Sequence, residues 1–91
     1  MTMRKFTLTS QFEKDVKRAR KRNFDMSRLS VVVRLLGLGD LEERQYRDHP
    51  LKGKHNDLRE CHLAPDWLLI YQSFADQVIL VRTGTHADLF R

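Results

Sequence analysis

The sequence has few residues that could cross-link a small fold. Its single cysteine, Cys61, can form no internal disulfide and, by itself, no zinc knuckle. No two histidines have the His-x-x-x-His spacing of a helical zinc site. We therefore expect the hydrophobic core alone to hold the fold, and we expect Cys61 to be an ordinary strand residue rather than a catalytic thiolate.

The sequence also lacks long hydrophobic runs, repeats and low-complexity tracts. Its longest unbroken hydrophobic run, Trp67 to Tyr71, is far shorter than the roughly 20 residues of a membrane span, and no signal peptide is recognisable. A chain of 91 residues has room for one domain, spanning 1–91, and for no large cofactor. We expect a soluble, cytoplasmic protein with no membrane partner.

Positive charge is concentrated in the first part of the chain. Residues 1–34 carry ten Lys and Arg against three Asp and Glu, whereas residues 35–91 carry seven against nine, so that the total is +5. The dense basic stretch at 14–22 could neutralise the phosphates of a nucleic acid or bind an acidic protein; the alternative is a solvated helix face. The cations that we expect to contact RNA or the ribosome are Lys14, Lys17, Arg18 and Lys21.

A short strand and two helices are predicted for the N-terminal half. Alternating apolar residues predict the strand at 4–9, and Ser10 with Glu13 forms a capping box that predicts the start of a helix. Asp25 is the predicted cap of a second helix, although three consecutive valines weaken that interpretation. The glycines that can end this helix are Gly37 and Gly39.

A meander of three strands is predicted for the second half. A polar connection occupies 40–56, and the strand-like runs lie at 58–63, 67–72 and 78–83. Their short turns imply antiparallel neighbours, and Thr85 with Asp88 can cap a final short turn. The expected fold class is α+β, with the order β-α-α-β-β-β and a twisted antiparallel sheet packed on the two helices.

Four acid/base residues lie at the ends of these elements: His49, His62, Asp66 and His86. Histidine, with an unperturbed pKa of roughly 6.5, can give or take a proton near neutrality, and a nearby carboxylate can orient it. Neighbouring strands can bring His62, Asp66 and His86 together, and His49 can join from the preceding loop. Such a group could cleave RNA by transesterification without a metal, with a base for the 2′-hydroxyl and an acid for the departing 5′-oxygen.

Other side chains near these points could support the same chemistry. Arg82 and Lys52 are cations that could stabilise the phosphorane, and Arg59 is a weaker candidate. Trp67 and Phe90 are either packing residues or a surface on which a base stacks. Each histidine, taken alone, is also compatible with an ordinary hydrogen-bonded residue, and His and Asp are possible zinc ligands.

Three segments carry a more specific pattern: HPLKG at 49–53, RECHLAPDWLLIY at 59–71 and LVRTGTHADLF at 80–90. Together they resemble the YafQ branch of the RelE superfamily of bacterial toxins, over nearly the whole chain. The resemblance implies a microbial RNase-like fold, ribosome-dependent cleavage of messenger RNA in the ribosomal A site, and neutralisation by a DinJ-like antitoxin. It also implies that the toxin-antitoxin complex represses its own operon, with the antitoxin contacting the operator DNA.

The resemblance also marks five functional positions: His49, His62, Asp66, His86 and the supporting aromatic Phe90. We expect His86 to be the general acid and Asp66 the general base, while His49 and His62 position the phosphate or share the base role. No metal or other cofactor is implied. The residues expected to assist are Arg82, by stabilising transition-state charge, and Trp67, by shaping the site.

From the sequence alone, three other functions remain open. The first is a nonenzymatic module that binds RNA or the ribosome through the basic helices. The second is a domain that only pairs with an acidic protein, for which the helical charge would suffice. The third is a metal-dependent nuclease, which a chelator would inactivate. Toxicity on expression, relieved by the neighbouring gene, would argue against the first two.

Overall fold

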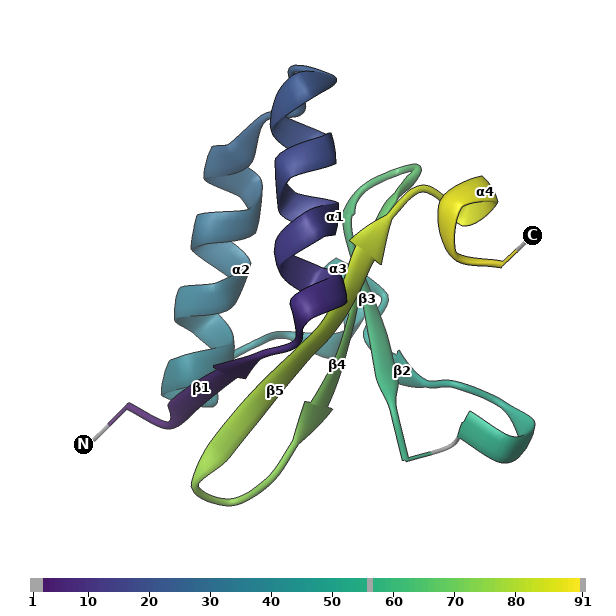
Figure 1. Cartoon of the computed structure of the whole chain (residues 1–91). Helices are drawn as coiled ribbons and strands as arrows, with labels where there is room; N and C mark the ends of the chain where they lie inside the picture. The colour runs from purple at the N-terminus through teal and green to yellow at the C-terminus, as the bar shows by residue number, and fades with distance from the viewer. Residues whose placement is uncertain (1–2, 56, 91) are drawn as a thin grey trace.

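Two long helices pack against one face of a five-stranded sheet (Figure 1). This computed structural model describes residues 3–55 and 57–90, without the side chain of His55. The elements are β1 (Lys5–Leu8), α1 (Ser10–Lys21), α2 (Met26–Leu38), α3 (Glu43–Tyr46), β2 (His49–Pro50), a 3₁₀ turn (Gly53–His55), β3 (Arg59–Ala64), β4 (Trp67–Ser73), β5 (Gln77–Gly84) and α4 (His86–Leu89). Within the described part of the chain, no helix is long and apolar enough to span a bilayer.

The sheet has the strand order β1-β5-β4-β3-β2. The predicted meander is confirmed, because β3, β4 and β5 are antiparallel neighbours. The α+β class is confirmed as well, but the sheet is mixed, since β1 pairs with β5 in parallel. The connection at 40–56 holds three elements that were not predicted, α3, β2 and the 3₁₀ turn, which are too short to show a periodic pattern.

The first helix has a different cap from the predicted one. Thr9, not Ser10, is the N-cap, and its side chain accepts a hydrogen bond from the backbone N–H of Phe12 at 2.9 Å. The predicted capping box of Ser10 and Glu13 is therefore wrong. The reason is that Thr9 also bonds to β5, where its hydroxyl donates to the carbonyl of Val81 at 2.7 Å.

The boundaries of the second helix follow local signals in the sequence. The Asp25 side chain caps α2 as predicted, by accepting from the backbone N–H of Ser27 at 3.1 Å. Gly39, with φ of 75°, ends the helix in the left-handed conformation that glycine adopts without strain. Gly37 lies inside the helix instead, where a Cβ atom would come within 3.1 Å of the Phe6 ring.

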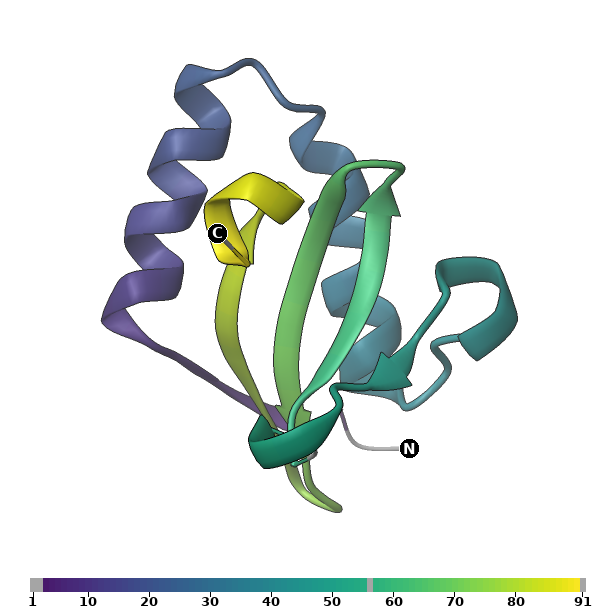
Figure 2. The same ribbon diagram turned by 90° about the vertical axis from the view of Figure 1, so that its right-hand side faces the viewer.

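The core lies between the helices and the sheet. Its buried apolar side chains come from α1, α2 and the three meander strands, and include Phe12, Val32, Leu36, Leu69, Tyr71 and Leu80. Cys61 is fully buried on β3, and burial raises the pKa of its thiol, as expected of a strand residue without a thiolate role. Figure 2 shows the opposite side of the sheet, which the two long helices leave uncovered, with α4 beside the ends of the strands.

Candidate active site

The pairing of β4 with β5 brings Asp66 and His86 close together. Leu68 at the start of β4 pairs with Gly84 at the end of β5, so the residues just outside these strands are neighbours. One carboxylate oxygen of Asp66 accepts a hydrogen bond from the backbone N–H of His86 at 3.0 Å and lies 2.6 Å from the ring Nδ1 of His86. A carboxylate only accepts hydrogen bonds, so Nδ1 carries the proton and Nε2 remains available for a substrate.

These contacts also set the charge of Asp66. Hydrogen bonds from the His86 backbone and ring lower the pKa of the Asp66 carboxyl, which therefore stays ionised near neutrality. Both side chains are more than half exposed, at 64% for Asp66 and 55% for His86. The arrangement suits an imidazole that is oriented by a carboxylate and open to solvent on its other side.

His62 on β3 is the second imidazole of this group. Its ring centre lies 6.0 Å from that of His86, and its Nδ1 is buried with no hydrogen-bond partner among the described residues. Burial lowers the pKa of His62, Glu60 opposes that change, and Arg47 adds to it. A half-buried imidazole with a lowered pKa is neutral near pH 7 and can accept a proton.

His49 joins the group from β2, paired with Glu60 on β3. Its Nε2 lies 3.0 Å from a carboxylate oxygen of Glu60, and its Nδ1 lies 3.0 Å from the carbonyl oxygen of Pro50. Glu60 was not predicted. The signal was present in the sequence, because Glu60 and His62 are two residues apart on one strand and so point to the same face.

A hollow of about 300 Å³ opens beside His62. Arg47 lines it, in a left-handed conformation with φ of 49°. This cation was also missed, because it lies in the connection that showed no regular pattern. The remaining lining residues are Arg28, Gln45, Tyr46, Leu63, Ala64 and Pro65.

Arg82, predicted to stabilise the transition state, is bound to α1 instead. Its Nε donates to one oxygen of Asp15 at 2.9 Å, and its Nη2 donates to the other at 3.3 Å. The physical reason is that β1 pairs with β5 only as far as Leu80, which leaves the end of β5 open to α1. There Asp15 also accepts from the backbone N–H of Thr83 at 3.1 Å. The structure thus commits Arg82 to an ion pair with α1, and no hydrogen bond among the described residues joins it to the histidines.

The two predicted aromatic residues have different environments. Trp67 is 3% exposed and packs edge-to-face on Phe24, with ring centres 5.0 Å apart, so it belongs to the core and offers no stacking surface. Phe90 is half exposed, and its ring centre lies 6.4 Å from that of His86. Lys52 is exposed in the loop after β2.

The basic face of α1 is only partly available to a partner. Lys14, Lys17 and Lys21 are exposed, as predicted. Arg18 is different, because its guanidinium lies 3.2 Å from Asp15 and 3.7 Å from Asp88. Three of the four predicted cations therefore remain candidates for contacts with RNA.

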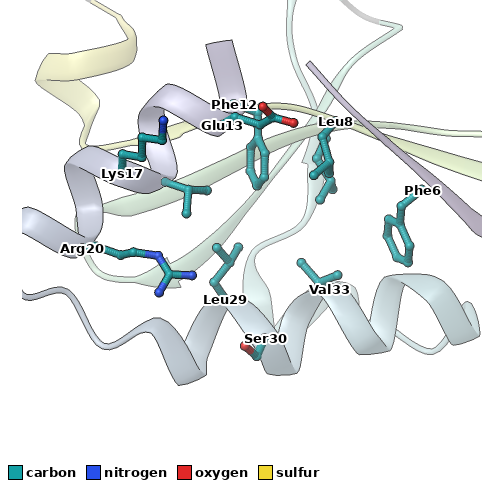
Figure 3. Close-up of a pocket in the computed structure, with 11 residues that line it drawn as sticks. Phe6, Leu8, Phe12, Glu13, Lys17, Arg20, Leu29, Ser30 and Val33 are labelled. Carbon is teal, nitrogen blue, oxygen red and sulfur yellow. The ribbon is translucent and has the colours of Figure 1, made fainter. Parts of the chain in front are cut away.

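A larger hollow lies away from this chemistry, between β1, α1 and α2 (Figure 3). It measures about 700 Å³ and is lined mainly by apolar side chains such as Phe6, Leu29 and Val33, with Lys17 and Arg20 also contributing. None of the four acid/base residues lines it. Across residues 3–55 and 57–90, no three His, Cys, Asp or Glu side chains are grouped to hold a metal ion.

Comparison with known proteins identifies the family. The model of the family described as "Bacterial toxin of type II toxin-antitoxin system, YafQ" matches residues 4–91. The mRNA interferase toxin YafQ of Escherichia coli K12 is 42% identical over 91 residues, which cover 99% of each chain.

Solved structures give the same result. The E. coli DinJ-YafQ toxin-antitoxin complex matches with a TM-score of 0.90 and 41% identity, over 98% of this chain and 99% of that one. A metal-bound toxin from Helicobacter pylori matches with a TM-score of 0.88 and 42% identity, over 97% and 100% of the two chains. The chain therefore belongs to the YafQ family of bacterial toxins from type II toxin-antitoxin systems.

Proposed function

We propose that this protein is an mRNA interferase, the toxin of a type II toxin-antitoxin system, which cleaves messenger RNA by metal-independent acid/base transesterification. The observation that carries the proposal is the Asp66–His86 contact beside His62, on the uncovered side of the sheet. The E. coli relative named an mRNA interferase supports the same activity.

In the proposed reaction, the base removes the proton of the 2′-hydroxyl and the 2′-oxygen attacks phosphorus. The bond from phosphorus to the 5′-oxygen breaks, and His86, protonated on both ring nitrogens, gives its Nε2 proton to that departing oxygen while Nδ1–H stays on Asp66. The products are a 2′,3′-cyclic phosphate and a 5′-hydroxyl. The ring centres of His62 and His86 are 6.0 Å apart, so hydrogen bonds of about 3 Å from the two rings can reach oxygens of one phosphodiester.

The geometry favours a different base from the one expected from sequence. Asp66 accepts two hydrogen bonds from His86, and its lowered pKa makes it a weak proton acceptor. We assign it the role of orienting His86. His62 is the better base, because an imidazole binds a proton more strongly than this carboxylate does and because burial, by lowering the pKa of His62, keeps its ring neutral near pH 7.

Three further side chains, Glu60, Arg47 and Phe90, complete the proposed site. The Glu60 carboxylate holds one ring nitrogen of His49, and His49 binds the phosphate through its other ring nitrogen once that nitrogen leaves the Pro50 carbonyl. The Arg47 guanidinium, beside His62 at the hollow, supplies the positive charge that was expected of Arg82. Phe90, half exposed next to His86, offers a ring on which a base can stack.

The proposed partners are the ribosome with its messenger RNA and a DinJ-like antitoxin, in the cytoplasm. The exposed cations Lys14, Lys17 and Lys21 can bind RNA phosphates. The E. coli relative forms a complex with the antitoxin DinJ, which supports a cognate antitoxin here. Operator DNA is contacted only through the antitoxin in this proposal.

The test is to map the ends of RNA fragments made by the purified protein, with and without programmed ribosomes. The proposal requires 5′-hydroxyl and cyclic phosphate ends, produced only when ribosomes are present. Because ribosomes need magnesium, the metal content of the purified protein is measured separately. Fragments with 5′-phosphate ends, or activity that follows a bound metal, would overturn the proposed chemistry.

A further inference from the structure

Asp88 on α4 lies in a cradle of two arginines from the end of α1. Its side chain is 12% exposed, and one carboxylate oxygen accepts from Arg22 Nη1 at 2.8 Å and lies 3.7 Å from Arg18 Nη2. Arg22 Nη2 reaches the other oxygen at 3.3 Å. The Arg22 guanidinium holds the pKa of Asp88 well below its usual range, so the group stays ionised. Asp88 is therefore a fixed negative charge at the junction of α1 and α4.

The same carboxylate also caps α4. It accepts from the backbone N–H of Thr85 at 2.9 Å, while the Thr85 hydroxyl accepts from the backbone N–H of Asp88 at 3.1 Å. The helix has only four residues, far fewer than an isolated helix needs for stability in water. Its conformation therefore depends on these side-chain contacts rather than on its own backbone hydrogen bonds.

The cradle is itself anchored in the fold. Arg18 bonds to Asp15, whose side chain is 1% exposed and also accepts from Arg82 and from the backbone N–H of Thr83. A Cβ atom at Gly84 would lie 2.9 Å from that of Asp88 and 3.2 Å from the Arg18 guanidinium, so close packing continues into α4. Buried residues of α1 and β5 are thus linked to α4 through these ion pairs and hydrogen bonds.

The helix held in this way carries His86. The His86 ring is 55% exposed, and its only described polar contact is with Asp66, which is itself 64% exposed. A pair this exposed orients the ring but holds it only weakly by itself, because exposed ion pairs contribute little. The position of the imidazole therefore depends on how firmly the backbone of α4 is held.

We propose that Asp88, with Arg22 and Arg18, is a positioning residue for His86: the arginine cradle fixes α4 so that the imidazole stays on Asp66 and faces the RNA. This inference rests on the proposed role of His86 as the general acid. Arg18 and Arg22 then hold α4, while the exposed lysines of α1 remain free to bind RNA.

The sign of the Asp88 charge makes the inference testable. Removing a negative charge near an RNA-binding surface should, by electrostatics alone, strengthen RNA binding. A positioning role predicts a lower kcat instead, with KM unchanged or lower. The cost should be about 10-fold to 100-fold, because an error of about 1 Å in a catalytic group has that effect.

The experiment compares Asp88→Ala with Asp25→Ala in the cleavage of messenger RNA on programmed ribosomes. Asp25 also caps a helix and pairs with an arginine, but on α2, so it is the matched control. We expect kcat to fall only in Asp88→Ala, and amide exchange at Leu89 and Phe90 to accelerate only there. Asp88→Glu should restore kcat, because a glutamate at this position of a capping box serves equally.

Two controls separate this inference from the function on which it rests. If His86→Ala is inactive while Asp88→Ala has the kcat and amide exchange of the wild type, the positioning role is overturned and the proposed function stands. If His86→Ala cleaves like the wild type, both fall. Should Asp88→Ala fail to fold, Arg22→Gln removes the shorter of the two ion pairs, at 2.8 Å, and leaves the capping box, and a wild-type kcat in that variant overturns the inference.

Discussion

The acid/base residues differ from one another mainly in how tightly the fold holds them. His62 is half-buried, with one ring nitrogen that has no partner among the residues that the structure describes. His49 has a polar atom at each ring nitrogen, and His86 is exposed on a short helix. Environment of this kind decides which of several identical side chains accepts a proton and which donates one.

The pH dependence of cleavage should report the lowered pKa of His62. As a base, His62 must be neutral, and burial places its pKa below the ordinary value of about 6.5. Activity should therefore persist to a lower pH than an unperturbed histidine would allow. NMR titration of the His62 ring protons, beside the pH profile of kcat/KM, checks this, and a midpoint at or above 6.5 would refute the assignment.

We expect Glu60 to contribute to RNA cleavage by orienting His49. The change Glu60→Gln removes the carboxylate 3.0 Å from the His49 Nε2 and nearly preserves the shape of the side chain. We expect kcat/KM to fall by about 10-fold, since His49 is no longer oriented but the two other imidazoles remain. The matched control is Asp57→Asn, an exposed carboxylate that hydrogen-bonds to Gln72 at 3.2 Å; it should leave cleavage unchanged.

At the level of elements, one buried carboxylate joins α1 to β5. Burial alone would raise the pKa of Asp15, but hydrogen bonds from Arg82, Gln11 and the backbone of Thr83 lower it overall. A group whose pKa is lowered on folding stabilises the fold above its unfolded pKa of about 3.9. That contribution disappears as the pH falls through the lower folded value.

Asp15→Ala should therefore destabilise the protein strongly. It leaves the buried backbone N–H of Thr83 without its partner, which costs about 1–3 kcal/mol, and it also releases Arg82, whose side chain is 31% exposed and can be hydrated. Urea unfolding at neutral pH measures the change in stability. Lys14→Ala, an exposed change on the same helix, should stay within about 0.5 kcal/mol of the wild type, and equal values for the two variants would disprove the role of Asp15.

Elements whose signals are local could be predicted from the sequence. Asp25 and Thr85 cap the helices that they were expected to cap, because a cap needs only its own side chain and the next few backbone groups. The parallel pairing of β1 with β5 joins strands at opposite ends of the chain, through partners such as Lys5 and Gln77. No local pattern encodes that pairing.

The residues of the candidate site also divide into those with a signal in the sequence and those without one. Asp66 and His86 flank strands whose antiparallel pairing was predicted, so their meeting could be expected. Arg47 lies in a connection without periodicity, which explains why it was missed. The ion pair of Arg82 with Asp15 joins β5 to a helix near the other end of the chain, so no local pattern indicated that this arginine has a partner.

In the molecule as a whole, the cations expected to bind RNA and the acid/base side chains lie on different elements. The exposed lysines Lys14, Lys17 and Lys21 are on α1, while the imidazoles are on β2, β3 and α4. We expect the combined change of Lys14, Lys17 and Lys21 to glutamine to weaken ribosome binding and reduce its salt dependence, with the slope falling by about one unit for each phosphate that is no longer neutralised. Binding measured across a salt series checks this, and an unchanged slope would show that α1 does not contact phosphates.

The most direct measurement is single-turnover cleavage of messenger RNA on programmed ribosomes by the wild type and by His86→Ala. His86 is exposed on the surface of a short helix, so this replacement should leave the fold intact, which circular dichroism verifies. Removal of the general acid should slow cleavage by about 10² to 10⁴-fold while ribosome binding is retained. Cleavage by His86→Ala at the wild-type rate would show that the imidazole on Asp66 is not the proton donor.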